Sequence, residues 1–388
     1  MGVEIKEIDR HFILRTLNLA VKARGMTSPN PMVGAVIVKN NSIIGEGFHE
    51  RAGLPHAEVV ALNRAGKNAK GATLYVSLEP CCHFGKTPPC VHAIIKSGIK
   101  RVVAATEDPN PLVSGKGFKY LKDQGIEVVH GIFEIKARRI NENFFKYIRE
   151  GMPFVTVKNA ITLDGKMSLR GSANKFYISS NESLKYTHYL RFLNDAIMVS
   201  AKTVINDNPS LNVRHGKKRI IEAFKNKKYA RIIIDRDLSV SPFSSIFSIP
   251  RGPHGRIILF TSSDYNAEKA NRKRVLEEKG AIIRDVSYNK VERNAKFLDL
   301  SKILRICAEE FEITGIIAEP GPKLFNSLVT AGLCDKLIFN ITPYIFGGER
   351  GVGLFDGLSL NGKDMLRFKD LDVKKIGNDF FAEYYPEK

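Results

Sequence analysis

The sequence contains no tryptophan and only five cysteines in 388 residues. An odd number of cysteines argues against the paired disulfide framework of a secreted protein, so we expect reduced thiols. No apolar run reaches the roughly 18 residues that a membrane-spanning helix needs, and residues 1–10 are too charged to form an apolar signal segment. Together these absences predict a cytoplasmic protein that does not associate with membranes.

Internal repeats and the usual fingerprint for dinucleotide binding are also missing. No internal repeat or low-complexity segment is found, and no G-x-G-x-x-G fingerprint for dinucleotide binding follows a predicted strand. The length corresponds to two or three domains of about 150 residues each. A polar segment with Gly and Pro at residues 149–153 precedes a new apolar strand. This predicts one domain over residues 1–150 and another over residues 151–388.

The chain carries an excess of positive charge, with 60 basic and 41 acidic residues and a net charge of +19. Such an excess is common in proteins that bind nucleic acid. Here the basic residues are dispersed, in short clusters at 217–219, 227–228, 272–274 and 374–375. We therefore expect a small-molecule partner and no nucleic acid, although charge alone leaves both open.

His56, Cys81 and Cys90 supply one imidazole and two thiols, which suit a tetrahedral zinc ion. Three protein ligands leave the fourth position for water, which is the arrangement of a catalytic site. Glu58 falls on the first turn of a helix predicted over residues 57–65, and Cys90 begins a second predicted helix. A glutamate beside zinc-activated water is the pattern of the zinc deaminases, in which the glutamate moves protons.

The spacing of the two cysteines departs from the common deaminase pattern of P-C-x-x-C, because eight residues separate Cys81 from Cys90. With Gly-Lys-Thr-Pro-Pro-Cys at 85–90, this stretch closely resembles the deaminase domain of the bifunctional riboflavin-biosynthesis deaminase/reductase family. Further matches are Pro-Asn-Pro-Met-Val-Gly at 29–34, Gly-Phe-His at 47–49 and Asp-Pro-Asn-Pro at 108–111. The resemblance covers nearly the whole chain.

The resemblance implies an N-terminal, cytidine-deaminase-like three-layer α/β/α domain, followed by an α/β domain similar to dihydrofolate reductase. Alternating strands and helices, among them a helix predicted over residues 134–147, independently argue for a layered α/β sheet. The family's activity would be zinc-dependent deamination of a 2,5-diaminopyrimidinone ribotide at C2, followed by NADPH reduction of its ribosyl group to ribityl. Family members commonly self-associate, so a homo-oligomer is expected.

The resemblance also assigns site residues. Glu58 would move protons, and Lys158 and Glu319 would lie near the reacting ribose. The implied contacts with the pyrimidine ribotide are Asn30, His49, His83 and Lys86 in the first domain, and Lys175, Arg191, Leu211 and Arg214 in the second. The implied contacts with the cofactor are Ala160, Tyr177, Thr203, Asp207, Glu319, Gly321, Pro322, Lys323, Leu324, Phe325, Asn326 and Ser327.

Physical arguments for the second domain are weaker than for the first. The Gly-containing turn at 319–322, before a predicted helix, offers free backbone N–H groups to a cofactor phosphate, but a plain strand-to-helix connection would look the same. Lys175 stands where the family often has serine, and Tyr177 where it has tryptophan. Two alternatives stay open: a polynucleotide deaminase, and a zinc-stabilised scaffold in which one half has lost its activity.

Overall fold

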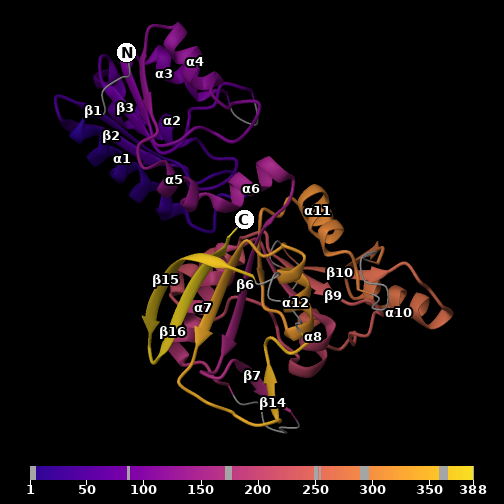
Figure 1. Ribbon diagram of the computed structural model, residues 1–388. Helices are drawn as coiled ribbons and strands as arrows, with labels where there is room; N and C mark the ends of the chain where they lie inside the picture. The colour runs from indigo at the N-terminus through magenta and orange to yellow at the C-terminus, as the bar shows by residue number, and fades with distance from the viewer. Residues whose placement is uncertain are drawn as a thin grey trace. The chain divides into compact units, whose positions relative to one another are not determined.

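The computed structural model describes residues 6–84, 88–170, 177–248, 252, 255–288, 297–357 and 366–387. The chain divides into two compact units, Met1–Met152 and Pro153–Lys388, which are described separately below (Figure 1). Among the described residues, no helix combines the length and the apolar character needed to cross a membrane.

The first unit is built on a mixed sheet. Its strands are β1 (Gly34–Lys39), β2 (Ser42–Phe48), β3 (Thr73–Val76), β4 (Arg101–Ala104) and β5 (Glu127–His130). Within the described residues their order is β2-β1-β3-β4-β5. β1 runs antiparallel to β2 and β3, whereas β3, β4 and β5 run parallel. The two parallel steps require crossover connections, which helices provide.

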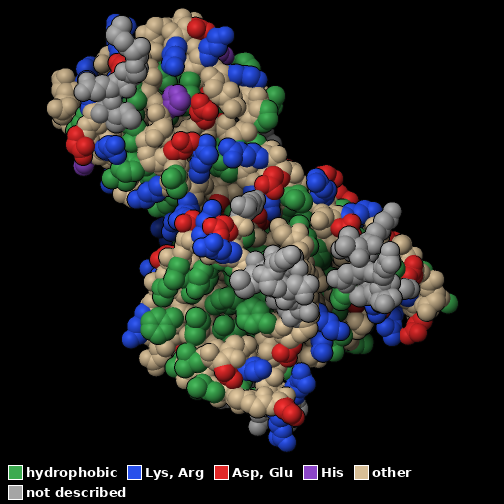
Figure 2. Space-filling model, in the orientation of Figure 1, with side chains coloured by type: hydrophobic (Ala, Val, Ile, Leu, Met, Phe, Trp, Pro, Cys, Tyr) green, Lys and Arg blue, Asp and Glu red, His purple; other side chains and the backbone are tan. Residues whose placement is uncertain are grey.

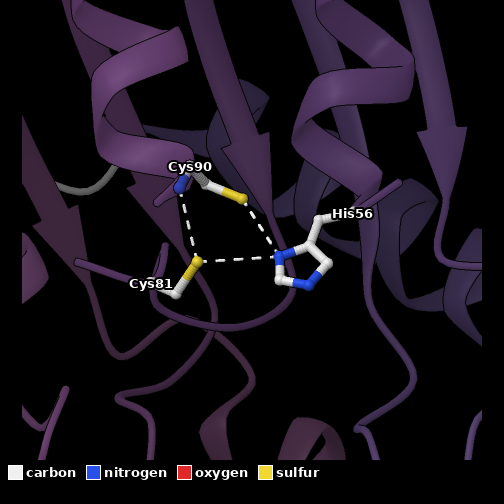
Figure 3. A group of neighbouring side chains, drawn as sticks. All are labelled: His56, Cys81 and Cys90. Atoms are coloured by element: carbon white, nitrogen blue, oxygen red, sulfur yellow. Dashed lines mark hydrogen bonds between the residues drawn. The ribbon is translucent and has the colours of Figure 1, made fainter. Parts of the chain in front are cut away.

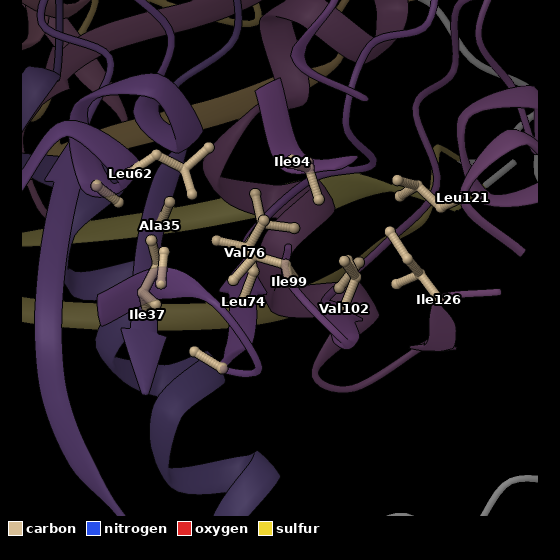
Figure 4. Packing of buried hydrophobic residues seen from close by; sticks show 14 of the residues in the cluster. Ala35, Ile37, Leu62, Leu74, Val76, Ile94, Ile99, Val102, Leu121 and Ile126 are labelled. Carbon is tan, nitrogen blue, oxygen red and sulfur yellow. The ribbon is translucent and has the colours of Figure 1, made fainter. Parts of the chain in front are cut away.

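Helices cover both faces of this sheet (Figure 1). They are α1 (Glu7–Ala20), α2 (Ala57–Ala65), α3 (Cys90–Lys96), α4 (Lys116–Asp123), α5 (Glu134–Ile140) and α6 (Glu142–Glu150), with 3-10 turns at Val21–Ala23 and Gly66–Ala69. Successive side chains of a strand point to opposite faces. Ala35 and Ile37 of β1 pack with α2, α3 and α4 (Figure 4), while Val36 and Val38 pack with α1 and α5. This is the three-layer α/β/α arrangement that was expected.

Two glycines allow α2 to lie directly on β2. A Cβ atom at Gly45 would collide with the carbonyl group of Ala61, and one at Gly47 would lie 2.6 Å from the side chain of Val60. Real Cβ atoms do not approach other atoms so closely, so glycine is required at both positions. The close approach places the start of α2, where the predicted metal and proton-transfer residues lie, beside the end of β2.

The helix predicted over residues 134–147 is interrupted, so this prediction is wrong in one respect. α5 ends at Ile140 and α6 begins at Glu142, with Asn141 between them at φ −109° and ψ 25°. Asn141 Oδ1 accepts a hydrogen bond from the backbone N–H of Met32 at 2.7 Å, and its Nδ2 donates to the Met32 carbonyl at 2.9 Å. The interruption fixes the loop that precedes β1.

The second unit contains a longer sheet. Its strands are β6 (Phe154–Ile161), β7 (Lys166–Leu169), β8 (Ala196–Ser200), β9 (Ala230–Ile234), β10 (Arg256–Ser262), β11 (Ala281–Val286), β12 (Gly315–Ala318), β13 (Lys336–Ile341), β14 (Gly351–Gly353), β15 (Phe368–Ile376) and β16 (Asp379–Pro386). In the described part of the unit, nine of these form one sheet in the order β11-β10-β9-β8-β12-β6-β13-β16-β15, and β7 pairs with β14. From β11 to β13 all neighbours are parallel, and β16 and β15 continue the sheet antiparallel.

The helices of the second unit follow its parallel strands. They are α7 (Asn181–Leu193), α8 (Ala201–Asp207), α9 (Lys218–Lys225), α10 (Ala267–Glu278), α11 (Leu300–Phe311) and α12 (Pro322–Thr330), with a 3-10 turn at Ser245–Ser248. In such sheets the carboxyl ends of the strands meet at one edge, which is where ligands bind. The ends of β6, β8 and β12 therefore bring Ala160, Ser200 and Glu319 to the same edge.

Candidate functional site

The three predicted zinc ligands come together in the first unit (Figure 3). His56 Nδ1 lies 3.2 Å from Cys90 Sγ and 3.6 Å from Cys81 Sγ, and the three ligand atoms all lie within 4.8 Å of one another. His56 is the N-cap residue of α2, Cys90 is the first residue of α3, and Cys81 lies in the loop after β3. One nitrogen and two sulfurs at this separation fit around a single tetrahedral zinc ion.

The local backbone favours a thiolate at Cys81. The backbone N–H of Cys90, at the start of α3, donates to Cys81 Sγ at 3.3 Å. Hydrogen bonds from the Cys90 thiol, from His56 and from this N–H lower the pKa of Cys81 to about 4. The pKa of Cys90 is raised, because its proton is shared with Cys81 and because it is buried. A thiolate is the form that binds a metal ion.

Glu58 is buried on the first turn of α2, beside this group. Burial raises the pKa of Glu58 to about 7, and the negative charge of Cys81 acts in the same direction. A carboxyl group with a pKa near neutrality can both take and give a proton. The arrangement therefore joins three metal ligands to a proton carrier, as the sequence pattern predicts.

Asn30 and His49 lie at the same end of the sheet. Asn30 Nδ2 lies 3.1 Å from His49 Nε2, and His49 Nδ1 lies 3.1 Å from the carbonyl oxygen of Pro55. The carbonyl can only accept, so Nδ1 donates to it and Nε2 accepts from Asn30. The His49 ring lies edge-on to that of His56, with 5.4 Å between centroids. Both nitrogens of His49 are thus occupied, and the ring fixes the direction of the Asn30 amide.

Sequence reasoning missed the group that supports the loop carrying Cys81. Glu79 is buried and accepts hydrogen bonds from the backbone N–H groups of Asp108 (3.2 Å), Gly115 (3.0 Å) and Phe118 (3.1 Å). Its carboxylate therefore holds the ligand loop against the start of α4. The only sequence signal was an acidic residue next to Pro-Cys, and its partners lie far along the chain.

Two other predicted contacts belong to the Cys81–Cys90 loop. His83 is half-buried, and its Nδ1 has no hydrogen-bond partner among the described residues. Lys86 lies outside the described residues. The role of both residues in binding the ribotide stays a prediction.

In the second unit, three predicted residues gather on one face of the sheet. Arg191 of α7 donates two hydrogen bonds to Glu319, at 2.6 Å and 2.7 Å, and a third to the carbonyl of Asn212 at 3.2 Å. Lys158 of β6 is buried beside this pair. Burial lowers the pKa of Lys158 against the opposing effect of Glu319, and the described residues offer its amine no hydrogen bond.

The remaining predicted substrate contacts lie on the loop after α8. Leu211 is buried with φ of +51°, and Arg214 is exposed with its guanidinium 2.9 Å from Asn212 Oδ1. The backbone N–H of Arg214 donates to Nδ1 of His188 on α7 at 3.2 Å. This bond ties the loop to the helix that carries Arg191. Lys175 lies outside the described residues.

The predicted cofactor contacts are spread over the carboxyl edge of the sheet. Ala160 is half-buried near the end of β6, Thr203 and Asp207 lie on α8, and Tyr177 is exposed. Gly321 is the N-cap of α12, and no atom lies within 4 Å of where its Cβ would be. This leaves open space in front of the α12 N–H groups, which suits a phosphate. Leu324 and Phe325 are buried on the first turn of α12, and their contact with the cofactor stays a prediction.

An α/β/α unit with a His/Cys/Cys group and an adjacent buried glutamate defines the class of zinc-dependent deaminases. The comparisons with known proteins agree. Residues 6–106 match the family model for the cytidine and deoxycytidylate deaminase zinc-binding region, and residues 153–382 match the RibD C-terminal domain.

Full-length relatives have the same two-part organisation. The chain is 42% identical over 383 residues to riboflavin biosynthesis protein RibD of Aquifex aeolicus, which covers 98% of this chain and 100% of the relative. The solved structure of Acinetobacter baumannii RibD matches with a TM-score of 0.85 at 34% identity, over 98% of this chain and 99% of that one. A deaminase/reductase from Thermotoga maritima matches at 0.79 and 33%, with coverage of 98% and 99%. The chain therefore belongs to the RibD family, the bifunctional deaminase/reductases of riboflavin biosynthesis.

Proposed function

We propose that this chain catalyses the two reactions for which the Thermotoga maritima relative is named. These are the deamination of diaminohydroxyphosphoribosylaminopyrimidine and the reduction of 5-amino-6-(5-phosphoribosylamino)uracil. The deamination is supported by the buried Glu58, which lies beside the three ligand atoms of His56, Cys81 and Cys90. The observation that supports the reduction is the buried amine of Lys158 beside Arg191 and Glu319.

In the deaminase unit, His56, Cys81 and Cys90 would hold the zinc ion, which when bound acts as a Lewis acid and makes a coordinated water more acidic. Glu58 takes a proton at its carboxylate and passes it to the departing ammonia. Asn30, oriented by His49, holds the pyrimidine base. His83 and Lys86, on the loop between the cysteines, are proposed to contact the ribose phosphate.

In the reductase unit, a nicotinamide cofactor supplies a hydride when it is bound. The open turn at Gly321 and the start of α12 bind its phosphates through backbone N–H groups. Lys158 provides the proton for the ribose ring oxygen as the ring opens, because its lowered pKa makes it a better proton donor than an ordinary lysine. Arg214 binds the substrate phosphate, and Arg191 fixes Glu319 next to Lys158. NADPH as the preferred cofactor stays a prediction from the resemblance.

We also propose that the chain forms homo-oligomers. Apolar side chains gather on the face of the second unit that Figure 2 shows, over β15 and β16. Leu371 and Val373 of the edge strand β15 and Phe380 of β16 are exposed there. A contiguous exposed apolar patch of this kind is typical of a contact surface. Sedimentation analysis of the purified protein tests this proposal, and a monomer at all concentrations would contradict it.

The two catalytic proposals are tested in one experiment. The zinc-loaded protein is given the diaminopyrimidinone ribotide and NADPH, and ammonia release and NADPH oxidation are followed together. Glu58→Gln should abolish both signals but oxidise NADPH normally when the deaminated ribotide is supplied. Lys158→Met should release ammonia at the normal rate without oxidising NADPH. Normal turnover by either variant would refute the role assigned to that residue.

A further inference from the structure

Asn340 is a fully buried polar residue near the carboxyl end of β13 that neither the motifs nor the resemblance single out. In the sheet it lies directly opposite Ala160 of β6, and Ile338 lies opposite Lys158. Residues two apart on a strand share a face. Asn340 therefore faces the same side of the sheet as Lys158.

That side is the one that α7 covers. Asn340 also pairs with Phe381 of β16, whose ring packs edge-on against Tyr186 of α7 with 4.8 Å between centroids. Asn340 Nδ2 donates to Ser179 Oγ at 2.9 Å, two residues before α7 begins. Arg191 reaches Glu319 from the same helix. Asn340 thus belongs to the layer that holds the reductase residues.

Only the nitrogen of the Asn340 amide forms a hydrogen bond to a described residue. Its Oδ1 is buried and has no hydrogen-bond partner among the described residues. A buried acceptor without a partner is unfavourable, so such groups are rare in folded proteins and each needs an explanation. The neighbouring Lys158 amine also has no hydrogen bond to a described residue. A buried acceptor and the amine of a buried lysine lie on one face of the sheet, and neither is hydrogen-bonded to a described residue, which points to a polar ligand between them.

The order of side chains across the sheet matches the order of groups in a ribotide. β12, β6 and β13 are adjacent, and adjacent strands lie about 5 Å apart. They carry Glu319 with its bound Arg191, then Lys158, then Asn340. Arg214, the proposed phosphate ligand, shares Asn212 with Arg191, so the phosphate lies at the arginine end. With the ribose at Lys158, the base extends toward β13.

From this arrangement we infer that Asn340 binds the pyrimidine base of the reductase substrate. Its Oδ1 accepts a hydrogen bond from the ring N–H that lies between the two carbonyl groups of the base, while its bond to Ser179 fixes the amide in place. This assignment rests on the proposed function of the second unit and adds a residue that recognises the base. It makes Asn340 a determinant of specificity for a ribotide over a simple sugar phosphate.

Equilibrium binding to the full-length protein tests the inference, with two probes. One is 5-amino-6-(5-phosphoribosylamino)uracil, and the other is ribose 5-phosphate, which lacks the base. Asn340→Leu keeps the volume but removes the hydrogen bond, and should bind the ribotide about tenfold more weakly or worse. Its affinity for ribose 5-phosphate should equal that of the wild type.

A matched control comes from the next strand. Asn159 is also a buried asparagine with a partnerless Oδ1, but its Nδ2 donates to the carbonyl of Pro320 and it faces away from Lys158. Asn159→Leu should leave the ratio of the two affinities unchanged. Equal weakening of both probes by Asn340→Leu would show a structural role only, and no weakening would show no contact; either result overturns the inference.

A second measurement needs no variant and therefore stands even if Asn340→Leu fails to fold. The ribotide methylated on the ring nitrogen flanked by the two carbonyl groups cannot donate this bond. It should bind the wild-type protein about tenfold more weakly than the unmethylated ribotide, and equal affinity would contradict the inference. The proposed function is tested separately by turnover: a wild-type protein that does not oxidise NADPH with 5-amino-6-(5-phosphoribosylamino)uracil would refute it, whereas the affinity ratios test the role of Asn340 alone.

Discussion

The ion pair between Arg191 and Glu319 yields a quantitative prediction. The two side chains are only 11% and 20% exposed, and two short hydrogen bonds of 2.6 Å and 2.7 Å join them. Arg191→Met removes the charge but keeps most of the apolar stem. The variant leaves the half-buried Glu319 carboxylate without its main partner, and Lys158 is then the cation that most lowers its pKa.

The size of the effect follows from two estimates. Burial raises the pKa of Glu319, but the charge and hydrogen bonds of Arg191, helped by Lys158, lower it from 4.5 to about 2. This difference corresponds to about 3 kcal/mol of stability. Because the folded pKa is the lower one, the contribution is complete above pH 4.5 and is lost as the pH falls from there toward 2. Removing one partner of a buried pair costs about 3–5 kcal/mol in other proteins.

Calorimetry of the full-length protein at pH 7 measures this loss. For a domain of this size, we expect the unfolding transition of the second unit to fall by about 6–20 °C in Arg191→Met. The transition of the first unit is the internal control and should not move. At pH 4 the difference from the wild type should shrink, because the unpaired carboxyl is then protonated.

A double variant separates the pair from general packing. Replacing Glu319 by Gln in the Arg191→Met background removes the stranded charge and should recover most of the lost stability. A fall of less than about 2 °C at pH 7, equivalent to less than about 1 kcal/mol, would refute the reasoning. So would a double variant no more stable than Arg191→Met.

Three further outcomes are expected. Removing zinc with a chelator should stop ammonia release but leave NADPH oxidation with the deaminated ribotide intact, and added zinc should restore ammonia release. Loss of both activities would contradict the proposal that the two reactions take place at separate sites. Glu58→Gln should retain stoichiometric zinc by metal analysis while deamination falls about 100-fold or more, and a smaller fall would mean that another group moves the proton. Glu79→Ala should weaken zinc binding about 10–100-fold in a competition assay, and unchanged affinity would show that its three backbone contacts do not support Cys81.

The zinc ligands and Glu58 could be predicted because each lies in a short, recognisable sequence pattern. His56 and Glu58 start one helix, Cys90 starts another, and each residue type at such a position has a direct chemical meaning. The supports of the group were not predictable. Glu79 bonds to residues near α4, and Asn141 bonds to Met32 across 109 positions of the chain. Periodicity extends a helix through Asn141, whereas the tertiary contact interrupts it there.

The reductase residues illustrate the opposite case. Arg191 and Glu319 meet across 128 positions, on a helix and at the end of a strand that no short motif connects. The parallel sheet brings such distant strand ends to one edge, so its site has no continuous sequence signature. The resemblance to the family supplied most of these residues, but it did not include Asn340, which only the strand register places beside Lys158.

Each unit contains a glutamate with a shifted pKa, and the charges beside each glutamate determine the direction of the shift. Glu58 is buried with the negative charge of Cys81 nearby, so its pKa rises to about 7. Glu319 is half-buried and faces Arg191 and Lys158, so its pKa falls to about 2. A carboxylate that stays ionised at neutral pH cannot serve as a proton donor, but it can orient cations. Under the proposed function, the proton for the ribose therefore comes from another group, and the role that we propose for Lys158 accords with its position beside Glu319 and its lowered pKa.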